Sequence, residues 1–103
     1  SDVYKRQLEE TLELYDKGLS VEDMARERNL SPTTIYGHLC KLYEEEHPID
    51  LNRYVTEFEV NQVKEARKIQ RNTNQLRPIY DQLKGSVDFH KIALALTILS
   101  KYH

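Results

Sequence analysis

The stretch SVEDMARERNLSPTTIYGHLCKLY, residues 20–43, decides the fold, because it contains the starts of two helices and the turn between them. Ser20 stands three residues before Asp23, a capping-box pattern in which the serine accepts a backbone hydrogen bond and the acid reaches back. Asn29 lies where the chain must turn sharply, since asparagine tolerates the left-handed conformation better than most residues. These signals predict a first helix that ends at Asn29.

The second helix of this stretch has equally local signals. Ser31 can cap it, and Pro32 fits its first position because no amide donor is needed there. Ile35, Leu39 and Leu42 recur at helical spacing and are expected to face the core. Two short helices joined by a tight turn have the layout of a helix-turn-helix, whose second helix normally enters the major groove of DNA.

The outward positions of this second helix are the candidate DNA contacts, namely Ser31, Thr33, Tyr36, Gly37 and Lys41. The threonine, tyrosine and lysine could reach bases or phosphates, and the glycine would permit close approach of a backbone. The same helix ends in three glutamates and carries a single lysine, which favours a retained fold or a protein contact over groove reading. A buried Tyr36 would remove the main candidate for a base contact.

Composition narrows the class of protein. At 103 residues the chain forms one domain or two very small ones. No apolar run approaches the roughly 20 residues of a membrane span, and no signal sequence precedes the helices, so we expect a cytoplasmic protein without a membrane partner. Cys40 is the only cysteine, which excludes an internal disulfide and fits a reducing compartment.

Neither a catalytic nor a metal site is expected. His38 and Cys40 are two apart on a helix and point in different directions, and no zinc-ligand spacing is present. We expect His38 to be a partly buried core residue. The chain has no G-x-x-x-x-G-K-[ST] loop that could hold a nucleotide phosphate, and no set of nucleophile, base and orienting acid. We therefore predict no cofactor and no small-molecule substrate.

Charge is distributed unevenly along the chain. The formal net charge is −2, which argues against a strong, salt-driven nucleic-acid binder. Residues 1–59 carry 7 basic and 14 acidic side chains, whereas residues 60–103 carry 8 basic and 3 acidic ones. The basic half is therefore not the half with the helix-turn-helix.

The rest of the chain also has helical patterns, so we predict an all-α fold of five or six helices. The expected units are a helix-turn-helix at residues 1–47, a connector at 48–55 and a second small helical unit at 56–103. Ile49-Asp50-Leu51 is expected to be extended and too short for a β-wing, which makes the first unit resemble a winged helix without a clear wing. Thr56 and Asp88 are expected to cap helices of the second unit.

A basic stripe is predicted on the helix that follows Thr56. Its members are Lys64, Arg67, Lys68 and Arg71, which fall at i, i+3, i+4 and i+7 and hence on one face. Arg77 extends the stripe. It could track a phosphate backbone without reading sequence, or it could be a solvated helix face.

Two families resemble the chain at these residues. Leu30-Ser31-Pro32-Thr33-Thr34-Ile35 with His38-Leu39 resembles the recognition helix of LuxR-type response regulators, over about ten residues. A longer resemblance includes Gly18-Leu19-Ser20-Val21-Glu22-Asp23-Met24-Ala25, Gly37-His38-Leu39, Leu76-Arg77-Pro78-Ile79 and Val87-Asp88-Phe89-His90-Lys91-Ile92. In that order the chain looks like the C-terminal helix-turn-helix domain of bacterial RecQ-like ATP-dependent DNA helicases, which act in DNA repair and recombination.

The longer resemblance implies an accessory, non-catalytic domain that contacts DNA weakly through phosphates or docks on the helicase core of the same chain. ATP and metal ions would belong only to the parent enzyme's other domains. Two alternatives remain open. One is a protein-interaction or docking domain that retains the fold, and the other is a sequence-specific transcription regulator, which would need a dimer to present two recognition helices.

Overall fold

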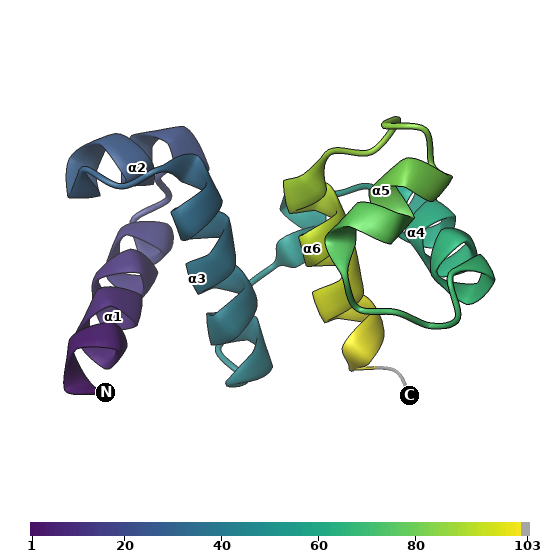
Figure 1. Ribbon diagram of the computed structural model, residues 1–103. Coiled ribbons are helices and arrows are strands. Elements are labelled where there is room, and N and C mark those ends of the chain that lie inside the picture. Colours follow the sequence, from purple (N-terminus) through teal and green to yellow (C-terminus); the bar gives the residue numbers. More distant parts are fainter. Residues whose placement is uncertain (102–103) are drawn as a thin grey trace. The chain divides into compact units, whose positions relative to one another are not determined.

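The computed structural model describes residues 1–101 and is built from helices, without a strand in that range (Figure 1). The all-α prediction is confirmed. The elements are α1 (Asp2–Asp16), α2 (Val21–Arg28), α3 (Pro32–Glu44), the 3-10 turn η1 (Leu51–Arg53), α4 (Glu57–Ile69), α5 (Leu76–Gln82) and α6 (Phe89–Ser100). The chain divides into two compact units, unit 1 from Ser1 to Ile49 and unit 2 from Asp50 onward.

Unit 1 contains the helix-turn-helix, in which α3 packs against both α1 and α2. The predicted caps form: the Ser20 hydroxyl accepts from the Asp23 amide at 3.1 Å, and the Ser31 hydroxyl accepts from the Thr34 amide at 3.1 Å. Asn29 takes the left-handed conformation at φ 54°, as the turn requires. The Asp23 carboxylate does not complete a capping box, because it pairs with Arg26 on its own helix.

The core of unit 1 is apolar where the three helices meet. Met24 of α2 and Ile35 and Leu39 of α3 are fully buried, and Leu8 of α1 is 4% exposed. These side chains fix the rotation of α3 about its axis. They therefore determine which of its residues face solvent.

The predicted extended connector is corrected by the structure. Leu51–Arg53 form a 3-10 turn, because the Asp50 side chain accepts from the Asn52 amide at 3.2 Å and holds the chain in a turn. Ile49 and Leu51 are buried on either side of Asp50. The division between the units falls within the predicted connector, and residues 50–55 lie with unit 2.

Unit 2 packs α4 mainly against α6, with α5 in contact with both. Ile79 of α5, Ile92 and Leu94 of α6 and Val63 of α4 are fully buried. No helix in the described part of the chain is long and apolar enough to cross a membrane.

The caps of unit 2 differ from each other. Thr56 and Glu59 complete a capping box, with the Glu59 carboxylate accepting from the Thr56 amide at 2.9 Å. The same carboxylate pairs with Lys91 of α6 at 2.8 Å, which ties the start of α4 to its main packing partner. Asp88 occupies the position before α6, but its side chain makes no capping hydrogen bond.

Candidate nucleic-acid interface

The outer face of α3 is the first candidate interface. Ile35, Leu39 and Leu42 turn one side of the helix into the core, so Thr33, Gly37 and Lys41 are exposed. These three residues stand four apart and form a line along the helix.

Gly37 leaves this face open. A Cβ added at residue 37 would meet nothing within 4 Å, so packing within the described structure does not demand a glycine there. A phosphate or a base edge could therefore approach the α3 backbone at this point.

The remaining predicted contacts on α3 are less available. The Ser31 hydroxyl is engaged in its cap and also lies 2.9 Å from the Thr34 hydroxyl. Tyr36 is half-buried, so it keeps only part of its ring accessible. Thr34 is exposed and was missed by the sequence reasoning, although its spacing of three from Gly37 and seven from Lys41 places it on the same face.

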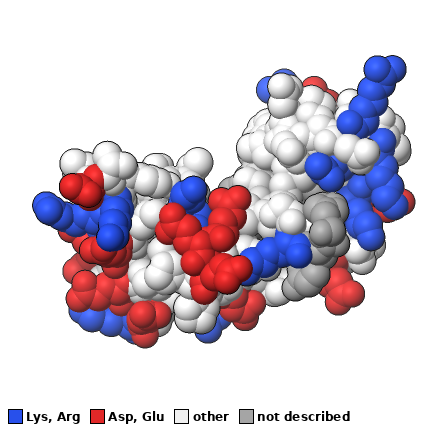
Figure 2. All heavy atoms as spheres, turned by 90° about the horizontal axis from the view of Figure 1, so that it is seen from below, with Lys and Arg blue, Asp and Glu red and all other residues white. Residues whose placement is uncertain are grey.

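Charge on unit 1 opposes a strong DNA contact. Its sequence has six basic and eleven acidic side chains, and red side chains dominate the face of unit 1 seen in Figure 2. Two of the exposed cations form local ion pairs, Lys17 at the end of α1 with Glu13 and Arg26 with Asp23 within α2. Beyond Lys41, α3 ends in exposed Glu44, and Glu45 and Glu46 follow it.

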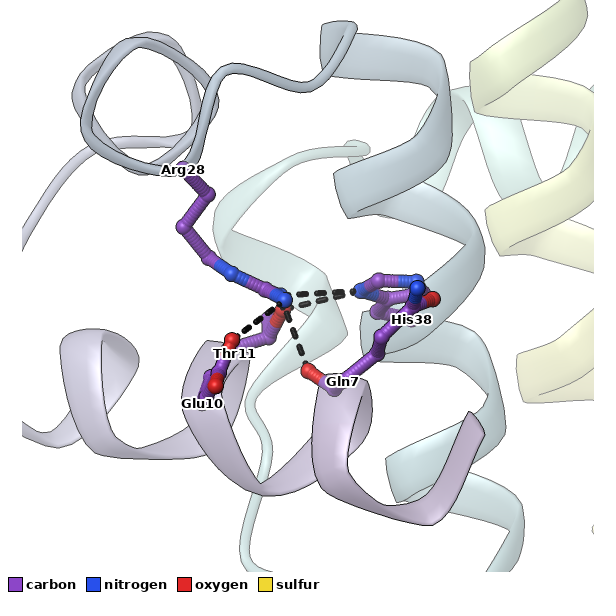
Figure 3. Close-up of polar contacts among 5 residues, drawn as sticks. All are labelled: Gln7, Glu10, Thr11, Arg28 and His38. Carbon is purple, nitrogen blue, oxygen red and sulfur yellow. Dashed lines mark hydrogen bonds and ion pairs between the residues drawn. The ribbon is translucent and has the colours of Figure 1, made fainter. Parts of the chain in front are cut away.

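Arg28, the last residue of α2, lies in a polar cluster that joins the three helices of unit 1 (Figure 3). Its side chain is 8% exposed, and its guanidinium donates to the Gln7 carbonyl at 2.8 Å and to the Thr11 hydroxyl. The second guanidinium nitrogen lies 2.9 Å from the Glu10 carboxylate. The cluster thus fixes the end of α2 to the middle of α1.

His38 connects this cluster to α3. Its Nδ1 lies 2.8 Å from the Thr11 hydroxyl and 3.4 Å from the Arg28 guanidinium. A neutral ring with its proton on Nε2 suits this arrangement, since Nδ1 can then accept from the Thr11 hydroxyl beside a guanidinium that only donates. Burial lowers the pKa of His38 from its ordinary value, and the positive charge of Arg28 lowers it further. The expectation of a core histidine is confirmed, since His38 is 3% exposed.

Sequence reasoning did not find Arg28. Its partners come from a different helix, 17 and 21 residues away along the chain. No periodicity within α2 distinguishes an arginine that is buried from one that is solvated.

The basic stripe on α4 is the second candidate interface. The prediction that its four members share one helix face is wrong for Arg71, because α4 ends at Ile69 and Arg71 takes a left-handed conformation at φ 58°. Lys64 and Arg71 are exposed, and their side chains form no ion pair or hydrogen bond within residues 1–101. Lys68 pairs with Glu65 at 3.1 Å, one turn away on the same exposed surface. Arg77 pairs with Asp81 on α5.

Arg67 has an internal role. Its guanidinium donates to the Thr73 carbonyl at 3.0 Å and to the Asn74 side chain at 2.9 Å. These bonds hold the loop that follows α4, where Arg71 and Asn72 take positive φ values of 58° and 59°. Arg67 is therefore turned from the stripe towards this loop.

Among residues 1–101 no group of three side chains that could hold a metal ion occurs. The two candidate surfaces consist of hydroxyls, exposed backbone and cations. A helix-turn-helix domain family matches residues 7–96, which is most of the chain. The protein belongs to this helix-turn-helix family. No curated protein and no solved structure matches the chain.

Proposed function

We propose that this domain is an accessory, non-catalytic DNA-binding module of a RecQ-like ATP-dependent DNA helicase, which helps to place the motor on its substrate. The observation that carries the proposal is the open face of α3, where Thr33, Gly37 and Lys41 form an unobstructed line in a member of a helix-turn-helix family. The parent enzyme rests on the sequence resemblance alone.

The charges favour weak binding that is dominated by phosphate contacts. Unit 2 has nine basic and six acidic side chains, and blue side chains are prominent on the face of unit 2 seen in Figure 2. Lys64 and Arg71 are its best phosphate contacts, because neither is held by an ion pair in the described structure. Non-specific DNA binding of this kind has dissociation constants of about 10⁻⁴ to 10⁻⁶ M at physiological salt.

The test is a fluorescence-anisotropy titration against duplex, forked and single-stranded DNA at several salt concentrations. We expect salt-sensitive binding with a preference among these three DNA structures. Replacing Lys64 and Arg71 with glutamate should weaken binding and flatten the salt dependence for duplex DNA, by about 0.9 in the logarithmic slope for each phosphate that the variant no longer neutralises. Unchanged binding by this variant would remove the α4 stripe from the interface.

A matched control makes the same change of charge elsewhere. Lys17 and Arg26 are exposed residues of unit 1 that lie outside α3. Their ion-pair partners, Glu13 and Asp23, also lie outside α3. Lys17→Glu with Arg26→Glu should reduce binding less than the α4 variant does. Equal reductions would show that net charge, and not a defined surface, controls affinity.

The non-catalytic part of the proposal has its own test. We expect no ATP hydrolysis by residues 1–103 with any of the three DNA substrates and Mg²⁺. Absence of DNA binding at low salt would instead favour the docking function, in which the retained fold contacts a protein.

A further inference from the structure

The outer face of α4 carries an apolar stripe that unit 2 does not cover. Phe58 is 71% exposed and Ile69 is 65% exposed, although both belong to the apolar class that a small domain normally buries. They stand eleven residues apart, which is about 16 Å along the helix and close to three whole turns. Both side chains therefore project from the same side of α4, one near each end.

A shallow groove runs along this stripe. It has a volume of about 370 Å³, and its exposed surface is almost entirely carbon. Gln62 and Glu65 lie between the two apolar ends, and Leu83 just after α5 forms part of the wall. Phe58, Gln62, Glu65 and Ile69 fall within about 60° of one another around the helix, and Asn61 and Ala66 line the groove on either side of them.

Charge along α4 changes sign from one end to the other. Glu57 and Glu59 lie in its first turn, whereas Arg67 and Lys68 lie in its last turn. Glu57 and Lys68 are exposed and lie on the same flank of the apolar stripe. A second α4 in parallel would bring like charges together, whereas an antiparallel one would bring opposite charges together.

We propose that this face binds a second copy of the chain, with the two α4 helices packed antiparallel about a two-fold axis. In that arrangement Phe58 lies against the partner's Ile69, and Gln62 lies against the partner's Glu65. The Gln62 amide is a donor and the Glu65 carboxylate is an acceptor. Glu57 then faces the partner's Lys68. Because each of these pairs occurs twice in an isologous contact, α4 is complementary to itself.

The proposed contact is small. One pair of helices buries less than the standard interface of about 800 Å² per partner, so we expect a weak dimer that forms in a concentration-dependent way. The inference does not depend on DNA binding, and it can be tested without DNA.

The test is sedimentation equilibrium from about 10 μM to about 1 mM protein. Wild type should change from a 12.2 kDa monomer towards twice that mass. Ile69→Glu and Phe58→Glu should each raise the dimer dissociation constant at least about tenfold, since each places a charge in both copies of an apolar contact. Val3→Glu is the matched control, because Val3 is 69% exposed on α1 and should leave the dimer unchanged.

A charge exchange tests the antiparallel order. Glu57→Lys should weaken the dimer, and adding Lys68→Glu in the same chain should restore it, because each new lysine then faces a new glutamate of the partner. Circular dichroism confirms that the helices remain formed in every variant. A monomer at every concentration would overturn the proposal. A dimer that tolerates Ile69→Glu, or one that the second exchange does not restore, would overturn it as well.

Discussion

The two units have the same number of α-helices in the described chain, but they use polar side chains differently. In unit 1 a buried arginine joins α1, α2 and α3, and most exposed charges are acidic. In unit 2 the helices meet mainly through apolar side chains such as Ile79, Ile92 and Leu94, and most of the cations are exposed. Unit 1 therefore adds a buried polar cluster to its apolar core, whereas unit 2 is held mainly by apolar packing.

This difference separates two properties that a DNA-binding helix-turn-helix usually combines. The open face of α3 belongs to the acidic unit, and the unpaired Lys64 and Arg71 belong to the other. Shape and charge complementarity to DNA are thus supplied by different parts of the chain. If the units differ in this way, a change in one unit should affect its own stability or binding and leave the other unit unchanged.

The largest effect is expected from Arg28→Ala in unit 1. The change removes a charged donor from the Gln7 carbonyl and from the Thr11 hydroxyl, which are left without that partner inside the helix-turn-helix. We expect a decrease of about 2–3 kcal/mol in the free energy of unfolding of unit 1. Hydrogen exchange measures this, because amides of α3 should lose protection while those of α4 and α6 keep it.

Arg26→Ala is the matched control for this experiment. Arg26 lies on the same helix, but its side chain is 75% exposed and its pair with Asp23 is a surface one. We expect a change below about 1 kcal/mol. Equal loss of protection in both units after Arg28→Ala would show that they unfold together, which would break the comparison.

Glu59→Ala should have a smaller effect and should act on unit 2. It removes the return half of the capping box and the ion pair with Lys91. We expect a decrease of about 1–2 kcal/mol in the free energy of unfolding, seen as faster exchange at the start of α4. Glu59→Gln should be less destabilising, because glutamine also completes a capping box. If the two variants behave alike, the interaction with Lys91 carries the whole effect.

Acid should destabilise unit 1 before unit 2. Burial and Arg28 lower the pKa of His38 below 6.5, so the unfolded chain takes up a proton first and stability falls as the pH drops past about 6.5. The hydrogen bond from Lys91 holds the pKa of Glu59 below 4.5, so its contribution is lost only as the pH drops past about 4.5.

The measurement is hydrogen exchange, corrected for intrinsic rates, between pH 7 and pH 4. Amides of α3 should lose protection first. His38→Gln should abolish the pH dependence that begins as the pH drops past about 6.5, while leaving that of α4 intact. A variant that keeps the slope would show that another group of unit 1 titrates there.

Much of the fold could be predicted from local sequence signals, whereas the candidate site could be predicted only in part. Ser20, Asn29 and Ser31 act on their immediate neighbours, so their roles could be predicted from the sequence and are confirmed. The prediction of an extended connector was wrong where a single side chain stabilised a turn. The expected extended segment ends one residue early, because Asp50 caps a 3-10 turn that begins at Leu51.

Side-chain partners were harder to predict than helices. A stripe drawn by helical spacing treats Arg67 and Lys64 alike, but the loop after α4 offers acceptors to Arg67 alone. The exposure of Phe58 and Ile69 was not predicted either, since spacing shows that two residues share a face but not whether another helix covers it.

The smallest effect on stability is expected at Gly37. If α3 is a binding surface, a side chain at this position should be tolerated by the fold but should weaken DNA binding. Glycine inside a helix costs about 0.5–1 kcal/mol relative to alanine, and a Cβ at this position meets nothing within 4 Å. Gly37→Ala should therefore stabilise unit 1 in thermal unfolding.

If α3 lies against DNA, Gly37→Leu should weaken DNA binding in the anisotropy assay, because the leucine side chain fills the space that a DNA backbone would need. Thr34→Leu, on the same face but one turn away, measures the effect of an added apolar side chain alone. Equal binding by wild type and Gly37→Leu would place the DNA on unit 2, with α3 retained for its fold.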